Sequence, residues 1–347
     1  MKQVMVGIIG GGMRAVEACY LAHQAEYEVT VFDNDPMCAA AGLADVFVCA
    51  DLHRTDVSGD LEACDFLLPV MDADAVPARL MACAQACGVP LLHGRAMADA
   101  ALLRAHAIPC VSQGLAHSGA QVYALLPRRS PVYAIQVIGD GQLYVPLAVT
   151  RILSEAGSRR CCVEAGAALP QGVREQMQTL GQAVGAALHL RGICTVEAVW
   201  QDGRLCVSAV DTRLPSRMPS VVYRATGLNM LALLYDVARG RLAGTAPQRS
   251  GYAACRSIAV DGAQLRAESG RAMARDGRLQ YAAYFFGCPE ALTSFRPGRQ
   301  AWGATLIAYD ADSMDNVYAR LDRALGRIAQ HTAAAAYQPA APARRVV

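Results

Sequence analysis

A glycine turn between an apolar run and a helix-like segment is the feature that most constrains what this chain can fold into. Residues 4–9 are continuously apolar, as in a buried strand of a parallel sheet. Three glycines follow at 10–12, and residues 13–25 then carry apolar side chains at helical spacing. Strand-like and helix-like runs alternate from there to about residue 108. This order predicts a parallel, doubly wound α/β domain over residues 1–108, with further strands at 28–32, 45–49, 65–70 and 89–92 and a helix at 76–87.

The pattern changes in the second part of the chain, residues 109–330. Asp140-Gly141 and Asp202-Gly203 each separate two strand-like runs, which is a strong hairpin signal. Between these hairpins, residues 173–188 repeat apolar side chains at steps of four and three and predict an amphipathic helix. This part therefore predicts a mixed α+β domain, while the Ala/Pro-rich residues 331–347 predict a disordered tail. Other elements expected here are a helix at 228–238, a strand at 304–309 and a final helix capped by Ser313.

Composition excludes several classes of protein. A net charge of +2 gives no strong field for nucleic acid or a membrane surface, and no run of about 18 apolar residues predicts a membrane span. The 13 cysteines include no CxxC pair, which favours buried thiols in a reducing compartment over a disulfide scaffold. No signal-peptide pattern opens the sequence. We expect a cytoplasmic protein with small-molecule partners; the oligomeric state stays open, with a homodimer as one option.

The glycine turn is a candidate ligand site. Residues 10–15 fit the pattern G-x-G-x-x-A between a strand and a helix, and Asp33 ends the next strand. Glycines let the backbone approach a phosphate at a helix N-terminus, and the aspartate can accept a hydrogen bond from a ribose hydroxyl. A tight turn without a ligand is the alternative, and Arg14 in the same turn is either an anion contact or solvated surface. The candidate cofactor-binding residues are Gly10, Gly11, Gly12, Met13 and Asp33.

Two carboxylates in the second hairpin can converge on one site. Alternation puts Glu197 on one face of the first strand, and both Asp211 and Arg213 on one face of the returning strand. Paired carboxylates hold a hard cation such as Mg²⁺ through oxygen, and an arginine grips phosphate with a bidentate fork. The pattern predicts a magnesium–phosphate site, and a surface ion pair is the alternative.

Around this hairpin the chain resembles a known family. The strings that carry the resemblance are Val196-Glu197-Ala198, Asp211-Thr212-Arg213-Leu214-Pro215-Ser216 and Pro219-Ser220-Val221-Val222-Tyr223. Matching strings in the first part are Gly10-Gly11, Glu17-Ala18 and Leu68-Pro69-Val70. They are similar to the 3-methylornithine–lysine ligases of pyrrolysine biosynthesis, which belong to the ATP-grasp superfamily. The similarity covers about residues 4–235, and its most specific part is R-x-P-S-x-x-P-S-V-V-Y.

The resemblance implies a Rossmann-like pre-ATP-grasp domain followed by an ATP-grasp-like domain with a shortened lid. It implies a carbon–nitrogen ligase that uses ATP and Mg²⁺ to phosphorylate the carboxylate of 3-methyl-D-ornithine. The ε-amine of L-lysine then attacks the acyl phosphate, a reaction that depends on positioning and on cations at the developing charge. Carried onto this chain, Glu197 and Asp211 hold Mg²⁺ and Arg213 is the catalytic residue. The implied substrate residues are Leu68, Asp72, Ser216 and Arg217.

The chain departs from the family pattern at several points. Ala209 stands where the family has a metal-binding glutamate, and Gly12 where it has a lysine. ATP-grasp enzymes hold nucleotide phosphates with lysines, whereas the only lysine here is Lys2; Arg128 and Arg129 are the nearest substitutes. Two other interpretations therefore stay open. One is a catalytically degenerate relative that binds an amino acid or a protein partner, and the other is an NAD-dependent dehydrogenase.

Overall fold

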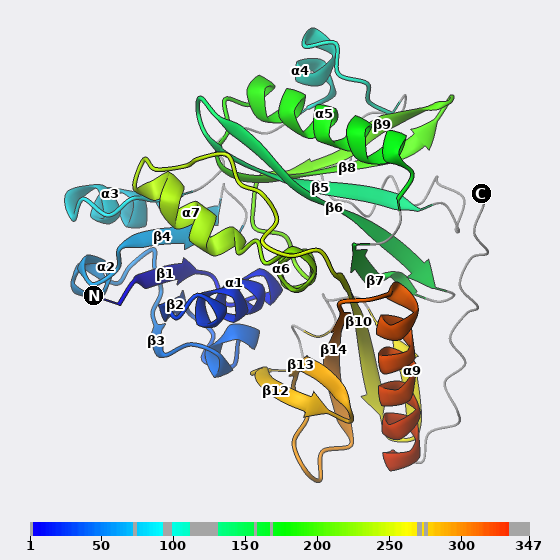
Figure 1. Cartoon of the computed structure of the whole chain (residues 1–347). Helices are drawn as coiled ribbons and strands as arrows, with labels where there is room; N and C mark the ends of the chain where they lie inside the picture. The colour runs from blue at the N-terminus through cyan, green and yellow to red at the C-terminus, as the bar shows by residue number, and fades with distance from the viewer. Residues whose placement is uncertain are drawn as a thin grey trace.

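The computed structural model describes residues 3–71, 75–92, 99–111, 131–155, 158–166, 169–268, 273 and 277–332 (Figure 1). Two sheets and the helices around them make up this part of the chain. The strands are β1 (Met5–Ile9), β2 (Glu28–Asp33), β3 (Val46–Cys49), β4 (Phe66–Pro69), β5 (Val132–Asp140), β6 (Tyr144–Glu155), β7 (Ser158–Ala165), β8 (Arg191–Gln201), β9 (Arg204–Asp211), β10 (Tyr252–Asp261), β11 (Gln264–Ala267), β12 (Gln280–Phe285), β13 (Cys288–Thr293) and β14 (Ala301–Asp310). The helices are α1 (Met13–Gln24), the 3-10 helix η1 (Ala39–Gly42), α2 (Ser58–Glu62), α3 (Ala78–Ala86), α4 (Ala100–Ala105), α5 (Gln171–Ala187), α6 (Met218–Thr226), α7 (Met230–Ala238) and α9 (Met314–His331).

The N-terminal sheet is parallel throughout, with strand order β3-β2-β1-β4. Helix α1 packs on one face, where Ile8 and Leu68 belong to its core cluster. Helices α2 and α3 pack on the other face, against Ile9 and Leu67. Burial on both faces explains why β1 and β4 are apolar without alternation. The predicted doubly wound arrangement is confirmed.

One predicted strand of this sheet is reduced to a single bridge. Leu91 pairs with Leu67 in parallel, supported by hydrogen bonds from Leu67 N–H to Pro90 O and from Leu92 N–H to Leu67 O. Within residues 89–92 this bridge is isolated and belongs to no named strand. The strand expected at 89–92 is therefore a single bridge at the edge of the sheet.

The second sheet has ten strands and is antiparallel in every pairing. Its path is β12-β13-β14-β10-β7-β6-β5-β8-β9, with β11 attached to β10. Both predicted hairpins are confirmed, because β5 pairs with β6 across Asp140-Gly141 and β8 with β9 across Asp202-Gly203. Asp202 and Gly203 both have positive φ, 51° and 78°, which suits the tight turns that join twisted antiparallel strands.

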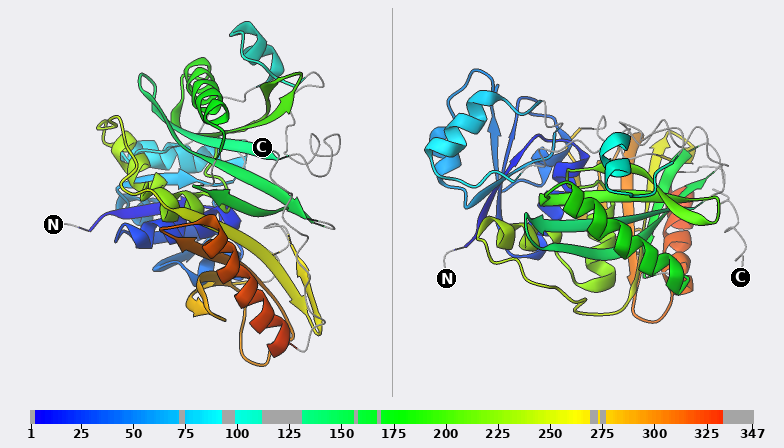
Figure 2. Two further views of the ribbon diagram at one scale, coloured as in Figure 1. Left: turned by 45° about the vertical axis from the view of Figure 1, so that its right-hand side comes forward. Right: turned by 90° about the horizontal axis from the view of Figure 1, so that it is seen from above.

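The large sheet separates two layers of helices. Helix α5 packs against β5, β8 and β9, and α9 packs against β10 and β14, on one face. Helices α6 and α7 lie on the other face, in one core cluster with α1 of the N-terminal part. Seen from above, the N-terminal sheet in blue lies beside the large sheet (Figure 2). Helix α6 therefore lies between the large sheet and α1, where a site would be shared by both parts of the chain.

Local sequence signals located some elements and missed others. Ser313 Oγ accepts from Asn316 N–H at the start of α9, as predicted from the capping residue. The sequence interpretation missed β7, the strands β10 to β13, and α6, whose Val221-Val222 pair is a weak helix signal. Pro219 fits α6 because it lies in the first turn, where a missing N–H costs nothing. No helix within the described ranges combines the length and apolar character needed to cross a membrane.

Candidate functional site

A small cavity lies where β8 and β9 meet the N-terminal end of α6 and the first turn of α1. Its volume is about 80 Å³. About 10–15 Å³ of such space holds one water molecule, so the cavity accommodates an ion or a small polar group. The structure brings together four residues predicted from the sequence: Glu197, Asp211, Ser216 and Arg217. The complete lining is Arg14, Ile152, Val163, Thr195, Glu197, Asp211, Pro215, Ser216, Arg217 and Met218.

Glu197 and Asp211 share one face of the large sheet. Asp211 on β9 pairs directly with Thr195 on β8, and Glu197 lies two residues further along β8. Directly paired residues, and residues two apart on a strand, project from the same face. A β-bulge at Ser208 sets this register. Ala198 pairs with Val207 and Glu197 pairs with Ala209, so Ser208 is an extra residue on β9 without a partner in the ladder. The bulge therefore directs Asp211 into the cavity.

Two guanidinium groups hold Asp211. Arg213 donates from Nε to Oδ1 at 2.7 Å and from Nη2 to Oδ2 at 2.9 Å, which is a bidentate fork. Arg14 Nη2 reaches Oδ2 at 2.5 Å from the first turn of α1. Arg213, the predicted catalytic residue, thus contacts the cavity residue Asp211 but does not itself line the cavity. Arg14 is a cavity residue that sequence reasoning left undecided between an anion contact and solvated surface.

The turn before α6 holds Arg217 in an unusual conformation. Arg217 has φ of 72° and is 7% exposed. Such left-handed backbone costs a non-glycine residue about 1–3 kcal/mol and is kept only where neighbouring contacts impose it. Glu17 supplies these contacts by accepting from Ser220 N–H at 2.9 Å, from Ser220 Oγ–H at 3.2 Å and from the backbone N–H of Arg217. Burial raises the pKa of Glu17 to about 7, although these hydrogen bonds lower it.

Two buried oxygens beside the cavity lack a hydrogen-bond partner among the described residues. They are Oγ of Thr195 and Oε1 of Gln136, which face each other across β8 and β5 and are 3% and 0% exposed. The Gln136 amide donates instead to Met218 Sδ at 3.0 Å. An unsatisfied buried polar group costs about 1–3 kcal/mol, and a bound ligand or water normally satisfies it. These oxygens indicate that the cavity accommodates a polar group.

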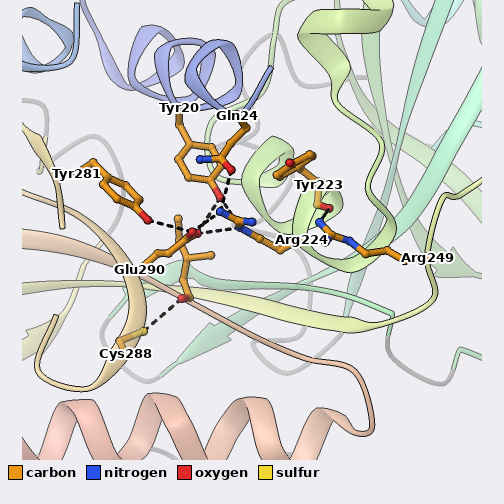
Figure 3. Close-up of polar contacts among 9 residues, drawn as sticks. Tyr20, Gln24, Tyr223, Arg224, Arg249, Tyr281, Cys288 and Glu290 are labelled. Atoms are coloured by element: carbon orange, nitrogen blue, oxygen red, sulfur yellow. Dashed lines mark hydrogen bonds and ion pairs between the residues drawn. The ribbon is translucent and has the colours of Figure 1, made fainter. Parts of the chain in front are cut away.

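One face of α1 carries a row of polar side chains toward the second part of the chain. Its members are spaced by three, three and four residues, so they lie along a single helical face. Figure 3 shows the end of this row, where Tyr20 and Gln24 approach Arg224 from above. The row aligns α1 with α6 and with the end of β9. Its contacts are Arg14 with Asp211, Glu17 with Ser220, and both Tyr20 and Gln24 with Arg224.

A buried ion pair anchors the far end of α6. Arg224 bonds to both oxygens of Glu290 on β13, and Glu290 also accepts from Tyr20 Oη at 2.8 Å and Tyr281 Oη at 3.1 Å (Figure 3). The side chains of Arg224 and Glu290 are 13% and 4% exposed. Burial, followed by the nearby Glu290 carboxylate, raises the pKa of Tyr281 to about 12. The cluster joins α1, α6 and the β12–β13 hairpin, and none of these four side chains lines the cavity.

The glycine turn lies next to the cavity and is partly closed by protein. Gly11 N–H donates to Asp33 Oδ2 at 2.6 Å, and a Cβ at Gly11 would lie 2.1 Å from Cys38 Sγ. Gly10 has φ of 99°, and Gly12 caps α1 with open space around it. Asp33 is thus used to hold the turn, and the proposed cofactor contacts of these residues and of the buried Met13 stay predictions.

Of the two remaining predicted substrate residues, Leu68 is not part of the cavity. Leu68 is 2% exposed and packs under α1 in the core of the parallel sheet. Asp72 lies outside the described residues.

A larger cavity opens on the other side of the end of β9. It has a volume of about 580 Å³, in the range of small-molecule pockets. Thr212 borders this cavity, whereas its neighbour Asp211 borders the small one. His189 and Arg191 contribute polar side chains from just beyond α5 and from the start of β8, and most of the other lining residues are of apolar type. The two cavities therefore border successive residues at the end of β9.

The residues of the small cavity fit Mg²⁺ only together with an anionic ligand. No group of three or more His, Cys, Asp or Glu side chains suited to a metal occurs within the described ranges. Mg²⁺ is commonly held by one or two protein carboxylates together with phosphate oxygens and water. Glu197 and Asp211 would supply these two carboxylates. Three arginines, Arg14, Arg213 and Arg217, lie at or beside the cavity. An anionic ligand would therefore meet guanidinium groups there as well as the two carboxylates that would hold its cation.

Comparison with known proteins agrees with the sequence resemblance. No family model matches the chain. It is 23% identical over 268 residues to the 3-methyl-D-ornithine–L-lysine ligase of Methanosarcina barkeri, covering 66% of this chain and 72% of that protein. The Methanosarcina acetivorans ligase is 24% identical over 268 residues, with the same coverage. The predicted resemblance to these ligases is confirmed.

Solved structures establish the fold. N5-carboxyaminoimidazole ribonucleotide synthetase from Thermotoga maritima superposes with a TM-score of 0.57 at 15% identity, covering 93% of this chain and 97% of that one. The biotin carboxylase domain of Hydrogenobacter thermophilus 2-oxoglutarate carboxylase, solved with MgADP and bicarbonate, gives 0.63 at 12% identity, covering 94% and 90%. Multifunctional pyruvate carboxylase from Rhizobium etli gives 0.64 at 14% identity, and the chain spans 37% of it. The architecture is that of the ATP-grasp enzymes.

Proposed function

We propose that the protein is an ATP-dependent carboxylate–amine ligase that joins two amino acids through an acyl phosphate. The substrates that the resemblance favours are 3-methyl-D-ornithine, as the carboxylate, and L-lysine, whose ε-amine is the nucleophile. The observation that carries the proposal is the convergence of Glu197, Asp211, Ser216 and Arg217 on one cavity. Glu197, Asp211 and Ser216 belong to the strings that resemble the ligases, and Arg217 directly follows one of them. The four residues come from two strands and the turn before a helix.

The roles of the residues follow from their chemistry. Arg213 and Arg14 present guanidinium groups at Asp211, where they would stabilise negative charge on a transferring phosphoryl group or a substrate carboxylate. Arginine suits this task because its fork matches phosphate and stays charged. Glu197 and Asp211 are the residues that would hold Mg²⁺. When bound with nucleotide, the ion would neutralise part of the phosphate charge.

Size assigns the ligands to different spaces. The small cavity accommodates a phosphoryl or carboxylate group, whereas the cavity of about 580 Å³ is large enough for a whole amino-acid or nucleoside moiety. The proposal therefore expects reacting groups to meet at the end of β9, with the bulk of one ligand beyond Thr212.

The decisive experiment measures products and not binding alone. Purified protein is incubated with Mg–ATP, 3-methyl-D-ornithine and L-lysine, and the amide is sought by mass spectrometry while ADP release is followed by a coupled assay. The proposal expects both signals, each dependent on both amino acids. Omitting one amino acid at a time is the control for background ATP hydrolysis. ADP release without amide, or neither signal across a panel of diamino acids, would contradict it.

A non-catalytic relative that binds an amino acid is the second candidate. Its support is Ala209 at the position of an expected metal ligand and the absence of lysines beyond Lys2. Calorimetry separates the candidates, because the ligase binds Mg–ATP whereas the degenerate relative binds an amino acid without it. Binding of NAD(H) alone would instead support the dehydrogenase interpretation.

A further inference from the structure

Glu17 is a buried carboxyl group that no proposed catalytic step uses. It lies in α1, is 1% exposed, and faces the first turn of α6 in the other part of the chain. Arg217 and Ser220 are the polar and charged groups that act on it, through two backbone N–H groups, one hydroxyl and one guanidinium. Burying an acid at an interface is costly, so its presence beside the cavity calls for a reason.

We propose that Glu17 is a positioning residue that holds Arg217 in its left-handed conformation and so keeps the Ser216–Arg217 turn in the cavity wall. Glu17 accepts the N–H groups of Arg217 and Ser220, which are first-turn donors of α6 without partners in the helix. Arg217 has φ of 72°, which a non-glycine residue keeps only under such constraint. The inference deepens the proposed function, because it concerns how the ligand-binding turn is built.

The protonation state of Glu17 should control how firmly the turn is held. An ionised carboxylate offers both oxygens to the three donors, whereas a protonated one replaces an acceptor with an O–H. Burial places the pKa of this group at about 7, so both forms are populated near neutral pH. The turn is therefore held most firmly above pH 7 and relaxes as the pH falls.

Glu17→Gln is the informative variant because it resembles the protonated acid in shape and charge. Mg–ATP affinity is measured by calorimetry for both proteins at each pH, so that ionisation of the ligand cancels in the ratio. At pH 6 the two affinities should agree within about twofold. At pH 8.5 the wild type should bind at least about fivefold more tightly.

The contribution of Glu17 to folding stability should fall as the pH rises, whereas its contribution to ligand affinity should increase. The folded-state pKa of Glu17 is raised from 4.5 to about 7, so its contribution to stability is complete below pH 4.5 and is lost as the pH rises toward 7. The melting temperature of the wild type relative to Glu17→Gln should therefore fall over this window. A residue that only supported the fold would show affinity and stability changing together.

A double-mutant cycle with Arg217→Gly tests whether Glu17 affects Mg–ATP affinity through Arg217. Glycine adopts positive φ without strain, so this variant keeps the turn and removes the guanidinium. If Glu17 acts through Arg217, adding Glu17→Gln to Arg217→Gly should change Mg–ATP affinity by less than about twofold at pH 8.5. Independent, multiplying effects would overturn the proposal.

Hydrogen exchange tests the positioning without any ligand. At pH 8.5, Glu17→Gln should accelerate exchange at least about fivefold in a peptide spanning residues 214–222, while a peptide from α9 stays unchanged. Unchanged exchange in both peptides would refute the role of Glu17. If the wild type binds no Mg–ATP, the proposed ligase function fails, and the exchange result still decides the positioning role.

Discussion

Arg14 and Asp211, 197 positions apart in the chain, form a direct ion pair of 2.5 Å between the first turn of α1 and the end of β9. The pair places a cation of the N-terminal part at the cavity of the second part. Arg213 grips the same carboxylate from its own strand end. The candidate site therefore depends on how the two parts of the chain pack.

Arg14→Ala should weaken Mg–ATP binding at least tenfold and leave the fold nearly unchanged. The pair is partly exposed, so its loss should cost stability only about 0–1 kcal/mol, whereas an anion in the cavity would lose a charge-assisted donor. Calorimetry and thermal unfolding measure the two effects. Arg54→Ala removes an 88% exposed arginine, also ion-paired, and should change neither. A stability loss without an affinity loss would make Arg14 structural.

Arg213→Lys should also weaken ligand binding at least about tenfold, which is 1.4 kcal/mol. Lysine keeps the charge but cannot reproduce the bidentate fork. The melting temperature should stay close to that of the wild type. Equal affinity for Mg–ATP and amino acid in the two proteins would assign Arg213 to a surface ion pair. Arg241→Lys, at an ion pair exposed on both sides, is the matched control.

Thr195→Val should leave stability equal or higher and reduce ligand affinity about fivefold or more. The variant removes a buried hydroxyl that has no partner among the described residues, at nearly constant shape. Thr150→Val is the contrasting control, because Thr150 Oγ donates to Ala134 O and its loss should cost about 1 kcal/mol. If Thr195→Val binds the ligand as tightly as the wild type, the ligand does not contact the Thr195 hydroxyl.

Ala209→Glu should create a stronger Mg²⁺ site. Ala209 opposes Glu197 and lies two residues from Asp211, so a third carboxylate would join the cavity face. Without metal, the added like charge should lower the melting temperature; with MgCl₂, the temperature should rise by several degrees. Ala209→Gln has the same shape without the charge and should show no such response. Equal responses of both variants would place residue 209 outside any metal site.

Removing one partner of the buried Arg224–Glu290 pair should destabilise the protein by about 3–5 kcal/mol, because the other charge is left buried. Urea unfolding of Glu290→Gln and Arg224→Ala measures this. Asp236→Ala, which breaks the exposed pair with Arg241, should cost only about 0–1 kcal/mol. A small effect at Glu290 would mean that water reaches the cluster shown in Figure 3.

Features that depend on residues close together in the chain could be predicted from the sequence, whereas features that depend on distant residues could not. The strand–glycine turn–helix unit, the Asp-Gly hairpins and the Ser313 cap depend on residues a few positions apart, and all appear in the structure. Strand alternation singled out Glu197 and Asp211, and resemblance to a family added their metal-binding role together with Ser216 and Arg217. The contributions of Glu17, Thr195 and Gln136 could not be found in this way, because each depends on packing between strands or helices.

Asp211 illustrates what the sequence determined and what tertiary structure decided. The turn at Asp202-Gly203 and the strand that ends at Asp211 depend only on neighbouring residues in the chain. The sequence alone therefore determined this hairpin. A regular register from that turn would place Asp211 opposite Cys194, on the face covered by α5. The bulge at Ser208 shifts the pairing by one residue, so that Asp211 opposes Thr195 and faces α1. A one-residue shift reverses the face of every later side chain, and only packing on both faces of the sheet selects it.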